Sequence, residues 1–296
     1  MGLIWPAPAV AIPPLAMTPA LQQHLQAWLQ EDLGRGDLSA AALQGCRGQA
    51  HWIAKADGVF CGGQLAAAVF GLMDSGVTAQ VLVNDGEAIS AGTRLLELEG
   101  PAAALVGAER TALNLAMRLS GIATATAALA SQLQGSGVQL VDTRKTTPGL
   151  RVLEKYAVRC GGGSNHRMGL DDAAMLKENH LAWAGGVAAA VAAVRAAAPW
   201  PSQVIVEAET IEEAKAAVDA GADGVLLDEF SPDALQQLVP ELRGQAQQRG
   251  KPVVLEASGI QPDQLRLYAS SGIDLISTSA PITRSSWLDL SMRFTG

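Results

Sequence analysis

Aromatic side chains are scarce in this sequence, since Phe, Trp and Tyr together make up only 4% of its 296 residues. The apolar share is 49% and comes mainly from Ala, Leu and Val. This composition suits helices packed closely on a sheet better than an aromatic-rich sandwich, and it excludes a disordered chain. The length allows two average domains, or a single barrel of about 250 residues with an addition.

Cysteine is also rare. The three cysteines, Cys46, Cys61 and Cys160, are far apart and show neither C-x-x-C spacing nor metal-ligand spacing with histidine. They predict buried thiols in a reducing compartment, and therefore a cytoplasmic protein.

Signals for export or membrane attachment are missing as well. Residues 1–17 contain four prolines and no Lys or Arg, so we expect no signal peptide. Pro6 stands where a myristoylation signal has Ser or Thr. The Ala-rich run 187–198 is short and contains Arg195, so no membrane span and no membrane partner are expected.

The chain has no overall excess of positive charge, since its net charge is -8. This argues against nucleic acid as a partner. The charge is unevenly spread, however. Residues 142–180 hold seven Lys/Arg against five Asp/Glu, a net +2, together with His166 and His180. A positive segment inside an acidic protein predicts a local pocket for a small polyanion.

The first part of the chain changes its pattern twice. Thr18 and Pro19 form a helix start, and apolar residues then recur at helical spacing up to Gly34. Residues 49–98 form short alternating runs separated by Gly and Asn-Asp-Gly turns, which predicts a small sheet. Residues 102–133 predict a long helix, interrupted near Gly121.

The rest of the chain alternates short apolar strands with Ala/Leu-rich helices. The expected strands are 138–141, 174–176, 204–206, 224–227, 253–255 and 273–276, with an uncertain one at 159–163. Such alternation predicts an α/β fold with parallel pairing, and the absence of a nucleotide-binding Gly fingerprint favours a closed barrel. We expect an N-terminal domain of residues 1–120, on which residues 285–296 pack, and a catalytic domain of residues 121–284.

Every predicted strand ends in charged or hydroxyl groups. These groups are Asp142–Lys145, Lys177–His180, Glu207 and Glu209, Asp228 and Glu229, Glu256 with Ser258 and Gly259, and Ser277–Ser279. Active sites of α/β barrels lie at this face, and the loops after the last strands commonly hold a phosphate.

The residue types indicate the chemistry. Basic groups can hold carboxylates and a pyrophosphate, and here they are Arg144, Lys145, Arg167 and Lys177. The carboxylates of Glu207 and Asp228 suit a metal ion, ribose hydroxyls or an oxocarbenium-like transition state. Anion-binding groups beside paired carboxylates predict glycosyl transfer from a phosphorylated sugar.

Several stretches closely resemble the quinolinate phosphoribosyltransferase family. They are DTRKTTPGLR at 142–151, LEKYAVR at 153–159, GGGSNHRMG at 161–169 and MLKENH at 175–180, with further matches at 31–37, 109–114 and 256–259. The resemblance implies a seven-stranded open α/β barrel joined to a smaller N-terminal α/β sandwich domain, the type II phosphoribosyltransferase fold. It also implies phosphoribosyl transfer from phosphoribosyl pyrophosphate to quinolinate with decarboxylation, giving nicotinate mononucleotide in NAD biosynthesis.

The resemblance further implies roles for individual residues. Thr143, Arg144, His166, Arg167 and Lys177 would bind quinolinate, with Arg110 reaching in from a neighbouring subunit of a homodimer or a hexamer. Lys145 and Lys177 would contact phosphate oxygens, and Ser258, Gly259, Ser277, Thr278 and Ser279 would receive the 5-phosphate. Glu207 and Asp228 would hold the ribose and the Mg²⁺ of the donor and stabilise the transition state. Lys145, or a water that it orients, would supply the proton after decarboxylation.

The chain departs from the family pattern at three positions. It lacks a further Gly or Asn between Gly259 and Ile260, it has Ser279 where a Gly is usual, and it has Ser164 where a larger polar residue is common. The first two departures concern the phosphate loops, and so the affinity for the donor. The residues Arg151, Lys155 and Arg159 recur at helical spacing with Glu154, and we expect them on a helix surface.

Three alternatives remain open at this point. A related phosphoribosyltransferase acting on nicotinate would not need the two-carboxylate clamp of Arg144, His166 and Arg167. An aldolase could use Lys177 as a Schiff-base nucleophile. A sugar-phosphate sensor on a barrel without activity would account for the altered Gly positions.

Overall fold

The computed structural model describes residues 12–295, which form two compact units. The first unit contains the chain up to Ala128, Leu153–Gly162 and the chain from Arg284 onward, and the second contains Leu129–Val152 and Gly163–Thr283. The sequence places a single boundary near residue 120 and assigns all of 121–284 to one domain. The structure differs because residues 153–162 pack with the first unit, where Tyr156 donates a hydrogen bond to Asp85 at 2.9 Å.

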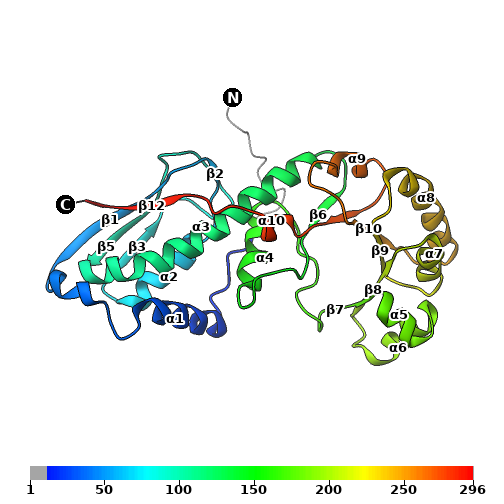
Figure 1. Ribbon diagram of the computed structural model, residues 1–296, viewed down its shortest axis with the longest axis horizontal. Coiled ribbons are helices and arrows are strands. Elements are labelled where there is room, and N and C mark those ends of the chain that lie inside the picture. Colours follow the sequence, from blue (N-terminus) through cyan, green and yellow to red (C-terminus); the bar gives the residue numbers. More distant parts are fainter. Residues whose placement is uncertain (1–11, 296) are drawn as a thin grey trace. The chain divides into compact units, whose positions relative to one another are not determined.

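The first unit is built on a four-stranded antiparallel sheet with the order β12-β1-β5-β3. The strands are β1 (Arg47–Ala54), β3 (Thr78–Val81), β5 (Arg94–Pro101) and β12 (Leu290–Thr295), and a small ribbon pairs β2 (Gly58–Val59) with β4 (Ala88–Ile89). The C-terminal strand β12 thus lies beside β1, far from it in sequence (Figure 1). Alternate residues of β1 face the core, where the fully buried Trp52 meets Phe70 edge-on.

The helical elements that lie wholly or partly in this unit are α1 (Pro19–Leu33), the 3-10 helix η1 (Leu38–Leu43), α2 (Gly63–Met73), α3 (Ala102–Gln132) and α4 (Arg151–Cys160). Helix α2 packs on β3 of the sheet, and α1 packs on α2. The predicted start of α1 is confirmed, since the Thr18 hydroxyl accepts the Leu21 N–H at 3.2 Å and Pro19 is the first helical residue.

The helix α3 runs without a break, so the predicted interruption at Gly121 is wrong. Gly121 serves close packing instead, because a Cβ there would lie 2.1 Å from the Ser286 carbonyl oxygen. By length and composition alone α3 could cross a membrane, but 61% of its most apolar window is buried inside the protein, as in a core helix. The pair α5 (Glu178–Ala184) and α6 (Val187–Ala197) of the second unit passes the same test only jointly, and a 91° bend separates the two helices.

Two expectations about buried residues in the first unit are wrong. Lys155 is fully buried rather than on a helix surface, as is its neighbour Glu154, whose carboxylate pairs with Arg118 at 2.8 Å. All three cysteines are free thiols, but only Cys61 and Cys160 are buried, whereas Cys46 is exposed.

The second unit is built on a parallel sheet of six strands, in the order β6-β11-β10-β9-β8-β7. The strands are β6 (Gln139–Val141), β7 (Ala173–Leu176), β8 (Gln203–Ala208), β9 (Gly224–Asp228), β10 (Val254–Ser258) and β11 (Leu275–Ser277). All six match strands predicted from the sequence. Each neighbour in space is also the neighbour in sequence, except that β6 pairs with β11, which is the order of a barrel.

The barrel is open rather than closed, and it has six strands rather than seven. The two ends of the sheet, β6 and β7, do not pair within the described residues. The strand expected at 159–163 is absent because α4 continues to Cys160. A single parallel bridge between Val141 and Ser164 takes its place at the edge of β6.

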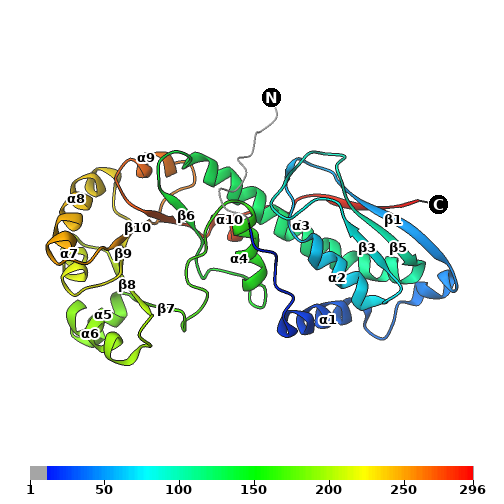
Figure 2. The ribbon, with the colours of Figure 1, turned by 180° about the vertical axis from the view of Figure 1, so that it is seen from behind.

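Helices cover the outside of the barrel strands (Figure 2). They are α5 (Glu178–Ala184), α6 (Val187–Ala197), α7 (Ile211–Asp219), α8 (Pro232–Gln248), α9 (Leu265–Ala269) and α10 (Ala280–Thr283). Alternate strand residues such as Val206, Leu227 and Leu255 join the apolar core under these helices. Because side chains alternate across a strand, the intervening residues, among them Glu207 and Glu256, point to the other face, the inside of the barrel.

Candidate functional site

The carboxyl ends of the barrel strands carry a cationic group at one edge, formed by Arg144 and Arg167. Arg144 follows β6, and its Nη1 is buried with no hydrogen-bond partner among the described residues. Arg167 lies in the loop before β7, where its Nη1 donates to the Ala173 carbonyl at 3.1 Å. Burial, and then the positive charge of Arg144, lower the pKa of Arg167. Two neighbouring guanidinium groups with an unused buried donor have the chemistry to bind an anion.

His166, the residue before Arg167, is held by two carboxylates at the strands of the sheet. Its backbone N–H donates to Asp142 Oδ1 at 2.8 Å, and its ring Nε2 lies 3.1 Å from Glu256 Oε2. Asp142 also accepts a hydrogen bond from the Asn165 side chain at 2.6 Å. Asp142 and Glu256 are 2% and 3% exposed. Two buried carboxylates from β10 and the end of β6 therefore hold the loop segment that carries Arg167.

Three carboxylates gather at the ends of β8 and β9. One oxygen each of Glu207, Glu209 and Asp228 lies within 4.8 Å of the others. Burial, followed by repulsion from Glu178, Asp228 and the other nearby carboxylates, raises the pKa of Glu209. Three carboxylates gathered in this way offer only oxygen ligands, which fit a hard divalent cation such as Mg²⁺.

The lysine and serine beside these carboxylates tie the strand ends together. Lys177, at the end of β7, forms an ion pair with Glu207. Ser258, at the end of β10, donates a hydrogen bond to Asp228. Glu229 follows Asp228 in the left-handed backbone region at φ 57°, which is uncommon for a residue with a side chain. Gly259 fits closely against it, because a Cβ there would lie 3.0 Å from Glu229 Cγ.

The turn after β11 contains the remaining hydroxyl groups. Ser277 is buried, and the Thr278 N–H donates to the Val141 carbonyl at 3.0 Å, which fixes the turn to the end of β6. The Thr278 hydroxyl accepts the Ala280 N–H at 3.1 Å. Ser279 accepts at its carbonyl from Ile282 and Thr283 and so begins α10.

Most predicted site residues thus follow strand ends of one unit. Those within the second unit are Thr143, Arg144, Lys145, His166, Arg167, Lys177, Glu207, Asp228, Ser258, Gly259, Ser277, Thr278 and Ser279. Thr143 accepts the Lys145 backbone N–H at 3.0 Å, and Lys145 is exposed. Arg110 lies on α3 in the first unit and is exposed. The substrate roles of these residues stay predictions.

Three residues that the structure brings into the site have no role predicted from the sequence. Glu209 joins the carboxylate cluster, while Asp142 and Glu256 hold His166. All three were noted only as polar residues at strand ends. Their place at the end of a strand was the one signal in the sequence. Whether such a carboxylate binds a ligand or holds another side chain depends on tertiary contacts, which the sequence does not show.

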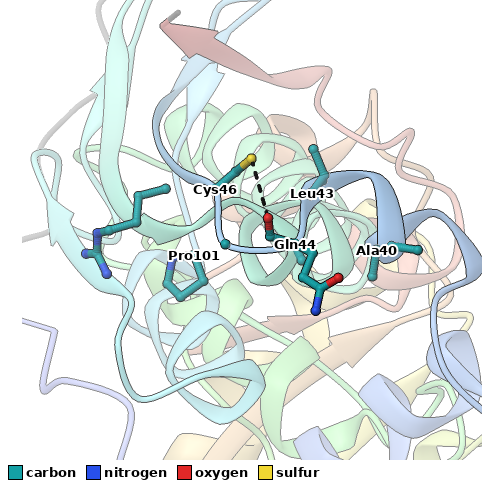
Figure 3. Close-up of a pocket in the computed structure, with 9 residues that line it drawn as sticks. Ala40, Leu43, Gln44, Cys46 and Pro101 are labelled. Atoms are coloured by element: carbon teal, nitrogen blue, oxygen red, sulfur yellow. Dashed lines mark hydrogen bonds between the residues drawn. The ribbon is translucent and has the colours of Figure 1, made fainter.

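A cavity of about 470 Å³ lies elsewhere, in the first unit (Figure 3). It is lined by Ala40, Ala41, Leu43, Gln44, Gly45, Cys46, Arg47, Pro101 and Ala103. The Cys46 thiol lies on its wall and contacts the Gln44 carbonyl at 3.9 Å (Figure 3). The lining is mainly apolar and contains none of the predicted site residues.

Comparisons with known proteins agree with the resemblance seen in the sequence. Residues 37–120 match the quinolinate phosphoribosyl transferase N-terminal domain, and residues 122–293 match the C-terminal domain of the same family. A probable nicotinate-nucleotide pyrophosphorylase [carboxylating] of Synechocystis is 45% identical over 292 residues, covering 97% of this chain and 96% of the relative. The human nicotinate-nucleotide pyrophosphorylase [carboxylating] is 36% identical over 288 residues, covering 96% and 94%.

Solved structures agree as well. NadC from Streptococcus pyogenes superposes with a TM-score of 0.88 at 38% identity, covering 95% of this chain and 98% of that one. The nicotinate-nucleotide pyrophosphorylase from Francisella tularensis gives a TM-score of 0.87 at 35% identity, covering 95% and 99%. The chain belongs to the quinolinate phosphoribosyl transferase family.

Proposed function

We propose that this protein transfers the phosphoribosyl group of phosphoribosyl pyrophosphate to quinolinate, with loss of CO2, to give nicotinate mononucleotide and pyrophosphate in NAD biosynthesis. Family membership supports the reaction. The structural observation that carries it is the buried, unpartnered Nη1 of Arg144 beside Arg167. A guanidinium group prepared in this way fits a carboxylate, and two such groups fit a dicarboxylate.

The reaction proceeds in two linked steps. The pyridine nitrogen attacks the anomeric carbon, the bond from that carbon to pyrophosphate breaks, and the ring becomes cationic. The carboxylate next to the nitrogen then leaves as CO2, because the cationic ring accepts the electron pair of the breaking bond. A proton taken up at that ring carbon completes the balance. We assign this proton to Lys145, or to a water that it orients.

The acidic half of the site stabilises positive charge. Glu207 and Asp228 present carboxylates at the ends of β8 and β9, where an oxocarbenium-like ribose develops positive charge in the transition state. Lys177, paired with Glu207, places an ammonium group between this half and the dicarboxylate site. It would contact both the substrate carboxylate and the oxygens of the donor.

Mg²⁺ is the proposed cofactor. The carboxylates of Glu207, Glu209 and Asp228 fit it, because Mg²⁺ prefers oxygen ligands and is commonly held by one or two carboxylates together with substrate phosphates. When bound, the ion neutralises charge on the pyrophosphate leaving group. The 5-phosphate would meet Ser258, Gly259 and the turn from Ser277 to Ser279.

We further propose a cytoplasmic homodimer, or a larger assembly, in which Arg110 enters the site of the neighbouring subunit. Arg110 is exposed on α3, as such a role requires. Mixing Arg110→Ala protein with Lys177→Ala protein tests this directly. Shared sites predict recovery of part of the activity, and subunit exchange without recovery would contradict them.

The reaction itself is tested with quinolinate labelled in its carboxylate groups. We expect labelled CO2 only when phosphoribosyl pyrophosphate and Mg²⁺ are both added. The folded, assembled protein releasing no CO2 under these conditions would refute the proposed function. Product formation from nicotinate at an equal kcat/KM would assign a different substrate.

A further inference from the structure

Glu256 occupies an unusual position for a carboxylate. It lies on β10 at a barrel-facing position and is 3% exposed. Its Oε2 contacts the ring of His166, while its Oε1 is buried and has no partner among the described residues. A buried carboxylate with unused bonding capacity is unfavourable for stability, so its presence points to a function.

The hydrogen bonds around His166 fix the state of its ring. The Arg167 backbone N–H donates to His166 Nδ1 at 2.7 Å, so Nδ1 is an acceptor and carries no proton. The proton of the neutral ring is therefore on Nε2, which donates to Glu256 Oε2 at 3.1 Å. A continuous chain of hydrogen bonds runs from the Arg167 backbone through His166 to Glu256.

These hydrogen bonds fix the position of the Arg167 backbone, and so the point from which its side chain extends. The segment 163–172 lies beyond the edge of β6 and belongs to no strand apart from the bridge at Ser164. Its position at Arg167 depends on side chains, since the Arg167 N–H is bonded to a ring and not to a neighbouring strand. The guanidinium end of Arg167 is held by the Ala173 carbonyl.

Glu256 acts on the arginines only indirectly, because its carboxylate contacts His166. This indirect contact affects how the arginines can bind a ligand. A carboxylate paired directly with Arg144 or Arg167 would compete with the carboxylates of a substrate. Glu256 instead contacts His166, which leaves the Arg144 guanidinium with a buried donor unused. The Glu256 carboxylate therefore holds His166 in place without taking up the N–H donors of Arg144 and Arg167.

We propose that Glu256 is a positioning residue for dicarboxylate binding, which acts through His166 to set the place of Arg167. This inference rests on the proposed function for the identity of the dicarboxylate, quinolinate. It assigns His166 a supporting role, with its Nδ1 and Nε2 engaged by the protein.

Steady-state kinetics of single and double variants test the inference. Glu256→Ala is expected to raise the KM for quinolinate about tenfold or more, while the KM for phosphoribosyl pyrophosphate stays within about twofold. Glu256→Gln keeps an acceptor for Nε2–H and should restore the KM for quinolinate to within about threefold of wild type. The double variant Glu256→Ala/His166→Ala should equal His166→Ala alone, because both act along one chain.

Ser258→Ala is the matched control, since Ser258 lies on the same strand and its hydroxyl bonds to Asp228. It should raise the KM for phosphoribosyl pyrophosphate and leave that for quinolinate unchanged. An equal rise of both constants in Glu256→Ala, multiplicative effects in the double variant, or no rescue by Gln would each overturn the inference.

A spectroscopic measurement separates this inference from the proposed function. Imidazole ¹⁵N chemical shifts of the ligand-free enzyme should show His166 with Nε2 protonated and Nδ1 unprotonated, and this preference should be lost in Glu256→Ala. A mixed tautomer in wild type would refute the positioning role, whatever the substrate. Absence of CO2 release with the expected tautomer would refute the reaction alone.

Discussion

Replacing Arg144 by Met should weaken binding of quinolinate and yet stabilise the ligand-free protein. The two effects have one cause. The Arg144 guanidinium has a buried Nη1 without a partner, and its charge repels the neighbouring Arg167. Both features are unfavourable without a ligand and become favourable when a carboxylate is bound.

The magnitudes follow from ordinary hydrogen-bond energies. Loss of a hydrogen bond between charged groups costs about 1.5–3 kcal/mol, which corresponds to a rise of the quinolinate Kd of about 10- to 150-fold. Removal of an unpartnered buried donor contributes about 1–3 kcal/mol to the stability of the free protein. Each kcal/mol corresponds to about 2–4 °C in Tm for a domain of this size class.

Calorimetric titration with quinolinate and thermal unfolding of the ligand-free protein measure the two effects. Arg167→Met is the matched control, because Arg167 donates to the Ala173 carbonyl, so its loss should weaken binding and lower Tm. Arg144→Lys keeps the charge but not the planar fork, and should bind with intermediate affinity. A lower Tm of Arg144→Met, with quinolinate affinity unchanged, would show that Arg144 stabilises the fold and does not bind the substrate.

Three further predictions concern other parts of the chain. Glu209→Gln should raise the Mg²⁺ concentration needed for half-maximal activity about tenfold. In wild type, the Mg²⁺ concentration needed should fall as pH rises through the elevated pKa of Glu209, because the ionised carboxylate binds the ion. The same Mg²⁺ requirement in Glu209→Gln as in wild type would remove Glu209 from the metal site. Glu154→Gln should lower the free energy of unfolding by about 3–5 kcal/mol, because the largely buried Arg118 loses the negative charge of its ion-pair partner. Urea denaturation checks this, and a loss under about 1 kcal/mol, as for exposed pairs, would contradict it. Burial raises the pKa of Asp223, but hydrogen bonds from Lys251, the Val204 N–H and Arg195 outweigh burial and hold it below the usual 3.8. Its stabilisation is therefore present above pH 3.8 and lost as pH falls through the lower folded value, so Asp223→Asn should reduce the stability difference between pH 7 and pH 3, measured by urea midpoints.

The sequence pattern predicted the barrel strands well because each strand is a short apolar run that helices cover. All six strands match within a few residues, and polar groups follow each of them. The pattern failed at 159–163, where Cys160 and the following glycines resemble a short strand. The α4 helix extends to Cys160 because its side chains find partners in the first unit, where Tyr156 bonds to Asp85 and Glu154 pairs with Arg118.

Charged residues were mispredicted for the same reason. Lys155 was expected on a helix surface because charged residues at helical spacing usually lie there, and only tertiary contacts show that it is buried. Likewise, the sequence marks Glu256 and Glu207 as equivalent carboxylates at strand ends. The structure distinguishes them, since one faces His166 and the other faces Lys177 and two further carboxylates.

The segment before β7 is ordered mainly by side chains, and this has a consequence for how the enzyme can change. The N–H groups of His166 and Arg167 are bonded to Asp142 and to the His166 ring, and those of Met168 and Gly169 to Asp172. The loop is thus already rigid in the free enzyme, so a ligand loses little affinity to the entropy of ordering it. Since the sheet does not depend on this loop for its register, recognition of a different ring acid could evolve here while the barrel keeps its structure.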